Sequence, residues 1–206
     1  MSPVMICILL VVALLVSYLG AHLALRRENV SPTGSTRRMV RCALVAAVYA
    51  ALCLVLTPFS YGAIQVRVAE MLCLLPVFGA DYIVGVTLGC FLANLLGVSM
   101  GTTVAVDLVF GTLATLLACV CTWQLRHLRI RGLALPAALP PVIANALIVG
   151  AEITIFFTDG GFTWPVLAFN MVTVGLGEVI SCCILGVALV RLIEANRRLT
   201  AVFAAQ

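Results

Sequence analysis

The sequence predicts an all-α membrane protein: a bundle of six transmembrane helices preceded by one extra amino-terminal transmembrane helix. Apolar residues make up 64% of the 206 residues and charged residues only 10%, whereas a soluble domain has about 25% charged residues. The mean hydropathy is +1.22. Long apolar stretches alternate with short polar segments, and about 20 apolar residues are enough for one helix to cross a bilayer.

The first apolar stretch covers residues 4–25 and predicts the extra helix. The basic pair Arg26-Arg27 follows the stretch, whereas a secretory signal carries its basic residues before a shorter apolar core. We therefore expect an anchor whose amino end lies outside the cell. A linker rich in turn-forming residues continues to residue 36, so residues 1–36 form the first segment of the chain.

Six further helices are expected within residues 37–192, which leaves residues 193–206 as a cytoplasmic tail. Residues 68–77 are too few to cross a bilayer upright, so we expect this helix to tilt or to merge with its neighbours. Gly85, Gly89, Ala93 and Gly97 recur every four residues, a pattern that lets a neighbouring backbone approach closely. The six predicted helices cover residues 42–56, 68–77, 81–96, 103–123, 136–157 and 164–190.

The basic residues predict the topology. All twelve are arginines, and eleven of them fall in three clusters in alternate loops. Since cytoplasmic loops are enriched in basic residues, the amino terminus is expected outside and the carboxyl terminus inside. The net charge of +4 therefore indicates membrane orientation and not nucleic-acid binding. The clusters are Arg26, Arg27, Arg37, Arg38 and Arg41; Arg126, Arg129 and Arg131; and Arg191, Arg197 and Arg198.

The predicted topology places a group of polar residues in the outer half of the membrane. Arg67, the one arginine on the outer side, belongs to the polar segment 62–70 between two apolar stretches. A charge costs about 2.5–3.5 kcal/mol at the centre of a membrane helix. A group of polar residues as large as this one therefore indicates a function. We expect them to line a wet, outward-opening pocket that binds a ligand: Gln65, Arg67, Glu70, Asn94, Asp107, Asn145, Glu152 and Glu178.

Each of these residues also has a structural interpretation, and the sequence leaves both open. Arg67 and Glu70 could pair with each other. Asn94 and Asn145 could hydrogen-bond neighbouring helices, and Asp107 could cap its own helix. Glu152 and Glu178, which are expected to lie deeper in the membrane, could instead form a proton relay.

Several functional classes lack support in the sequence. No nucleophile elbow, metalloprotease motif or phosphate-binding glycine loop is present, so we expect no enzyme activity and no cofactor. Nine cysteines accompany only two histidines, and buried thiols commonly act as small apolar side chains, so we expect no metal site. A transporter without an ATP-binding motif needs an ion gradient or an energising partner.

Five blocks occur in a characteristic order along the chain. They are Ile64-Gln-Val-Arg-Val-Ala-Glu70 with Leu74-Leu-Pro76, Gly89-Cys-Phe-Leu-Ala-Asn94, Asp107-Leu-Val-Phe-Gly-Thr-Leu-Ala-Thr115, Leu139-Pro-Pro-Val-Ile-Ala-Asn-Ala-Leu-Ile-Val-Gly150 and Gly175-Leu-Gly-Glu178. These blocks resemble the QueT family, the substrate-binding S components of energy-coupling factor (ECF) transporters. The resemblance covers about residues 40–192, and the extra amino-terminal helix departs from the family's six-helix pattern.

The resemblance implies capture of a 7-deazaguanine: preQ1, preQ0, queuine or queuosine. A guanine-like edge carries two parallel donors that one carboxylate can accept together. Under this interpretation Glu70 or Glu178 accepts the ring edge. Asp107 and Glu152 are expected to bind a cationic group or ribose-like hydroxyls, and Asn94 and Asn145 the ring carbonyl and nitrogen.

The family also implies partners: a transmembrane T component and two ATPase subunits, with the S component toppling in the bilayer to release its ligand. Ala43, Ala47 and Ala51 recur every four residues and match the small-residue face on which S components dock, although ordinary packing in the bundle is the alternative. Three other functions remain open: a stand-alone proton-coupled carrier, an S component for another flat heterocycle such as a flavin or pterin, and a structural subunit without a ligand.

Overall fold

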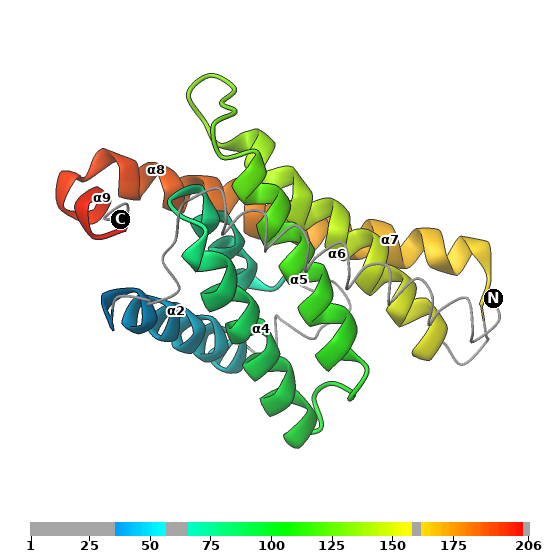
Figure 1. Ribbon diagram of the computed structural model, residues 1–206. Coiled ribbons are helices and arrows are strands. Elements are labelled where there is room, and N and C mark those ends of the chain that lie inside the picture. The colour runs from blue at the N-terminus through cyan, green and yellow to red at the C-terminus, as the bar shows by residue number, and fades with distance from the viewer. Residues whose placement is uncertain (1–35, 57–65, 158–161, 204–206) are drawn as a thin grey trace.

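The computed structural model describes residues 36–56, 66–157 and 162–203, and these residues form a helical bundle (Figure 1). The predicted helix at 4–25 and its linker through residue 35, and the candidate Gln65, lie outside the described residues. The described elements are α2 (Thr36–Val55), η1 (Val68–Val77), α4 (Asp81–Ser99), α5 (Asp107–Gln124), α6 (Leu135–Phe156), α7 (Trp164–Glu178), η2 (Val179–Gly186), α8 (Val187–Ala195) and α9 (Arg197–Phe203).

Five stretches in this part of the chain are long and apolar enough to cross a membrane. They are Arg38–Val55, Asp81–Ser99, Asp107–Gln124, Leu135–Phe156 and Trp164–Ala195. The last of these joins α7, η2 and α8 into one rod that includes eight residues of π-helix. The predicted fold class, an all-α membrane bundle, is thus confirmed for the described residues.

The long helices pack in the order in which they follow one another along the chain, with the short η1 set apart. The helix α2 packs against α4, α4 against α5, α5 against α6, and α6 against α7, and Figure 1 shows α4, α5 and α6 side by side. Such an arrangement follows from short connections between antiparallel membrane helices.

The short helix η1 lies at the centre of the bundle. It contacts α2, α4, α5, α6, η2 and α8, and most of its side chains are buried. Its ten residues form a 3-10 helix, which rises about 2.0 Å per residue and so covers roughly 20 Å of an apolar core about 30 Å thick. Protein packed on all sides of η1 makes a full-length span unnecessary there.

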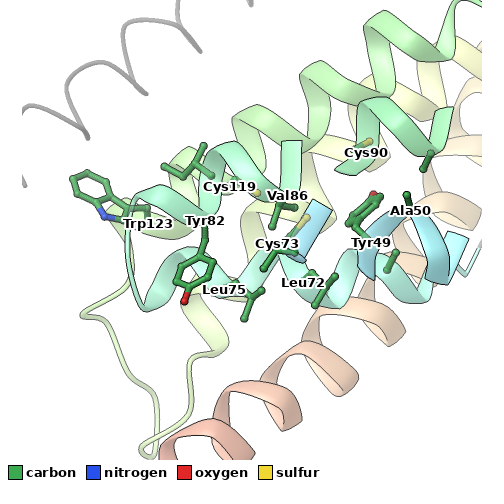
Figure 2. Packing of buried hydrophobic residues seen from close by; sticks show 14 of the residues in the cluster. Tyr49, Ala50, Leu72, Cys73, Leu75, Tyr82, Val86, Cys90, Cys119 and Trp123 are labelled. Atoms are coloured by element: carbon green, nitrogen blue, oxygen red, sulfur yellow. The ribbon is translucent and has the colours of Figure 1, made fainter. Parts of the chain in front are cut away.

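Glycines on α4 bring it close to α2, as the four-residue repeat predicts. A Cβ atom added to Gly89 would lie 2.7 Å from the Cβ of Tyr49 and 3.0 Å from the Cα of Ala46. A Cβ on Gly85 would lie 3.0 Å from the carbonyl oxygen of Cys42. This close approach places Tyr49 in the central apolar cluster, where it lies near Cys73 and Cys90 (Figure 2).

The described part of the predicted carboxyl-terminal tail, through residue 203, packs against the bundle. The ring of Phe203 at the end of α9 stacks on Tyr82 with 6.0 Å between centroids, and the Tyr82 hydroxyl donates a 2.9 Å hydrogen bond to the Phe203 carbonyl. Arg41 donates to the Val202 carbonyl at 3.2 Å and pairs with Asp81 at 3.4 Å. The end of α9 is thereby fixed to the amino-terminal parts of α2 and α4.

We predict that Gly89→Val destabilises the protein by about 1–3 kcal/mol, the usual cost of forcing extra volume into a packed contact. Thermal unfolding in detergent measures the loss. The control is Leu88→Val, because Leu88 is 44% exposed on the same helix and should tolerate the change. Equal melting temperatures for the two variants would contradict the close contact between α2 and α4.

Candidate ligand-binding site

A cavity of about 240 Å³, counting the space at its mouth, opens between α6, α7 and the residue that precedes η1. Its walls are formed by Arg67, Asn145, Val149, Val174 and Glu178. The enclosed part of this space measures about 10 Å³, which is room for about one water molecule, so a larger ligand enters only when the lining side chains move apart. Three polar and two apolar side chains converge there, and convergent polar groups are what fix the orientation of a ligand in a pocket.

The helical repeat of α6 and α7 explains which side chains reach the cavity. Asn145 and Val149 are four residues apart on α6, and Val174 and Glu178 are four residues apart on α7, so each pair shares one helix face. Each helix therefore presents one apolar and one polar side chain to the cavity. The helices approach closely because a Cβ on Gly150 would lie 2.9 Å from the Cα of Met171.

Glu178 lies where the α-helix of α7 changes into the π-helix of η2. Its side chain is buried, the Asn145 amide lies beside it, and the thiol of Cys182 donates to Oε2 at 3.4 Å. Stretches of π-helix are frequent at functional sites because they shift side chains out of the regular helical positions. Here the change occurs directly after the carboxylate that lines the cavity.

Arg67 connects the cavity to a buried polar network on α4 and α5. Its Nη2 donates to Oδ1 of Asn94 at 3.1 Å and lies 3.7 Å from Oδ2 of Asp107. The Nδ2 of Asn94 donates to the backbone carbonyl of Asp107 at 2.9 Å, and the hydroxyl of Thr103 donates to Oδ2 of Asp107. Asn94 thus hydrogen-bonds α4 to the start of α5, and Asp107 balances the charge of Arg67.

A glycine makes room for this network. A Cβ added to Gly111 on α5 would lie 2.9 Å from Nδ2 of Asn94 and 3.8 Å from Nη1 of Arg67. Since real Cβ atoms do not approach other heavy atoms so closely, any larger residue at position 111 would push the Asn94 amide away from Arg67 and Asp107.

Glu70 lies deeper in the bundle and is not part of the cavity wall. The hydroxyl of Tyr49 donates to its Oε1 at 2.5 Å, and the thiol of Cys73 donates to its Oε2 at 2.8 Å. The carboxylate is 1% exposed. Glu70 therefore attaches η1 to α2 through Tyr49, while Arg67, three residues earlier, pairs with Asp107.

Glu152 shares a helix face with Asn145 and lies beside Asp107. It is 2% exposed, and Asp107 and Arg67 are its ionisable neighbours. Among the described residues, no N–H or hydroxyl donor reaches either of its carboxylate oxygens, and the Asp107 carboxyl lies within hydrogen-bonding reach of its side chain. Glu152 and Asp107 thus form a close pair of carboxyl groups with Arg67 beside them.

Comparison with known proteins decides the family. Residues 39–195 match the model of the QueT transporter family. The chain belongs to the QueT transporter family. This is a family of transporters and not of enzymes, and the described spans show a multi-pass membrane protein.

The QueT relative found among curated proteins is the "Queuosine precursor transporter QueT" of Lactococcus lactis subsp. cremoris (strain MG1363). It is 41% identical to this chain over 83 residues, which is 39% of this chain and 46% of the relative. The alignment thus spans about half the length of that relative. No solved structure matches the chain.

The QueT core of this chain brings most of the predicted site residues into one connected region. Arg67, Asn145 and Glu178 line the cavity, Asn94 and Asp107 hold Arg67, and Glu152 adjoins Asp107. Glu70 is buried beside this region. Gln65 lies outside the described residues.

Several residues of this region were missed by sequence reasoning. Val149 and Val174 line the cavity, while Tyr49, Cys73 and Cys182 hold the two central carboxylates. Helical spacing offers a signal for the thiols, because Cys73 is three residues after Glu70 and Cys182 is four after Glu178. Tyr49 stands out as the aromatic residue in an alanine-rich stretch, Ala46-Ala47-Val48-Tyr49-Ala50-Ala51.

We predict that Gly111→Ala lowers the melting temperature because its Cβ displaces Asn94 from Arg67 and Asp107. The matched control is Gly175→Ala, whose Cβ would meet only the Cβ of Ala146, at an ordinary 3.5 Å. Both changes gain about 1 kcal/mol of helix propensity, so the difference between the two melting temperatures isolates the effect on the network. A Gly111→Ala variant as stable as Gly175→Ala would contradict the network.

Proposed function

We propose that this chain is the substrate-capture subunit of an ECF importer and binds a 7-deazaguanine queuosine precursor or salvage form from outside the cell. The observation that carries the proposal is the cavity in which Glu178, Asn145 and Arg67 face one another between two valine side chains. The name of the Lactococcus lactis relative, a queuosine precursor transporter, supports this choice of ligand.

The three polar groups complement the edge of a guanine-like ring. A carboxylate at Glu178 accepts the ring N–H and the exocyclic amine together, in a charge-assisted bidentate pair. The Asn145 amide beside it supplies one donor and one acceptor, and Arg67 donates to the ring carbonyl. Val149 and Val174 cover the faces of the flat ring. Under this proposal Glu178, and not Glu70, is the acceptor for the ring edge, because both oxygens of Glu70 are hydrogen-bonded by Tyr49 and Cys73.

Energy for uptake comes, in this proposal, from a T component and two ATPases, with toppling of this subunit to release the ligand inwards. The three alanines of the predicted docking face, Ala43, Ala47 and Ala51, are exposed on α2, whereas Ala46 and Ala50 are buried. An exposed stripe of small side chains allows a partner helix to approach closely. The proposed orientation has the amino terminus outside and the carboxyl terminus in the cytoplasm of a bacterial cell, in accord with the arginine clusters.

A stand-alone proton-coupled carrier is the second candidate, and the buried carboxyl pair of Glu152 and Asp107 is the observation that favours it. Buried carboxylates in membrane spans are typical of proton relays. Uptake into vesicles that contain this chain without ATPases, and that stops when an uncoupler is added, would support the carrier. Uptake that requires the ATPases and continues with the uncoupler would support the importer.

We predict that Glu178→Gln weakens binding of a 7-deazaguanine to the purified chain by at least about tenfold, or about 1.4 kcal/mol. The amide keeps the shape of the side chain but replaces one acceptor with a donor that faces the ring's own donors. Isothermal titration calorimetry measures the effect. The control is Glu194→Gln, because Glu194 forms a partly exposed ion pair with Arg129 and does not line the cavity. Unchanged affinity in Glu178→Gln would remove this carboxylate from the site.

We also predict that Ala47→Trp retains ligand binding and abolishes ATP-dependent uptake, because the indole would keep a partner helix away from α2. The control is Ile184→Trp, since Ile184 is 58% exposed elsewhere on the bundle. Uptake assays in vesicles with the partner subunits measure both variants. Full uptake by Ala47→Trp would place the docking surface elsewhere.

A further inference from the structure

We propose that Glu152 is a specificity-determining residue that binds a cationic substituent of the ligand, so that the site selects a protonated amine over a neutral group at that position. This inference deepens the proposed function and rests on it. Four observations support it: the burial of Glu152, the absence of an N–H or hydroxyl donor to its carboxylate among the described residues, its place on the same face of α6 as two cavity residues, and the charge balance around it.

Burial beside a second carboxyl group is costly for a carboxylate. Glu152 is 2% exposed, no N–H or hydroxyl of the described residues donates to its two oxygens, and the group within hydrogen-bonding reach is the Asp107 carboxyl. Buried polar groups are nearly always hydrogen-bonded, and an unpaired buried charge costs several kcal/mol. A ligand that donates hydrogen bonds to both oxygens would remove this cost, and an ammonium group has three such donors.

The position of Glu152 makes it a second contact for a ligand held in the cavity. Asn145 and Val149 line the cavity, and Glu152 follows on the same face of α6. With a rise of 1.5 Å per residue, Glu152 lies roughly 10 Å beyond Asn145 and roughly 4.5 Å beyond Val149 along the helix axis. A bicyclic ring whose edge meets Asn145 and Glu178 would therefore point its far end, with any substituent there, towards Glu152.

The charge balance calls for a cation and not for an anion or a neutral group. Arg67 is the basic residue here, and it faces both Asp107 and Glu152. Its guanidinium donates to Asn94 and pairs with Asp107, and Asp107 also accepts from Thr103. Two neighbouring carboxylates repel each other when both are ionised. Arg67 supplies one positive charge for the two acids, so one added positive charge next to Glu152 removes that repulsion and balances the second carboxylate.

Two chemically matched probes test the inference: 7-aminomethyl-7-deazaguanine, which carries a protonated amine, and 7-cyano-7-deazaguanine, which carries a neutral nitrile on the same ring. Their dissociation constants are measured by calorimetry with the purified full chain, its Glu152→Gln variant and the surface control Glu194→Gln. We expect the unaltered chain to prefer the amine by at least about tenfold. Glu152→Gln should abolish this preference by weakening binding of the amine while binding of the nitrile stays unchanged, and Glu194→Gln should retain it.

Three results would overturn the inference. Equal affinity of the unaltered chain for both probes would show that no counter-charge is in use, and would leave the proposed function intact. If Glu152→Gln weakens the binding of both probes to the same extent, Glu152 acts in folding or in contact with the shared ring and not on the substituent. Binding of neither probe by the unaltered chain would overturn the proposed function together with this inference. Should Glu152→Gln fail to fold, the ratio of the two dissociation constants of the unaltered chain still tests whether the site selects the amine over the nitrile.

Discussion

A charge placed in an apolar membrane environment must be paired or must face a polar cavity, and Arg67 satisfies both conditions. It is buried, pairs with Asp107, donates a hydrogen bond to Asn94 and lines the cavity. Because these partners come from α4 and α5 while Arg67 precedes η1, one guanidinium fixes three elements around the site. The arrangement of the central helix depends on this single buried cation.

The apolar contacts make the polar network geometrically possible. Gly111 leaves space for the Asn94 amide, and Gly89 lets α2 approach until the Tyr49 hydroxyl reaches Glu70. Gly150 does the same between α6 and α7, whose facing side chains form the cavity. Small residues at helix contacts are the usual means by which membrane helices pack closely, and here they determine which polar groups can meet.

The sequence predicts the membrane helices well because apolar length and turn residues are local signals. It also predicts the close contact made by Gly85 and Gly89, since a four-residue repeat of small residues has a direct packing consequence. It does not reveal which carboxylate lines the cavity. Glu70 and Glu178 look equivalent in the sequence, and only the positions of Tyr49 and Cys73 around Glu70, together with the start of the π-helix after Glu178, distinguish them. Likewise, the return of α9 onto Tyr82 depends on contacts between residues more than one hundred positions apart.

The central claim is that polar side chains from separate helices enclose a site for one small, flat, nitrogen-rich ligand. Native mass spectrometry of the purified full chain, released gently from detergent, tests it most directly because a tightly held ligand is weighed together with the protein. We expect a one-to-one adduct with the mass of a 7-deazaguanine, or the appearance of that adduct when the compound is added, and its loss in Glu178→Gln. A folded chain that carries no adduct after the compound is added, or that keeps it in Glu178→Gln, would contradict the account.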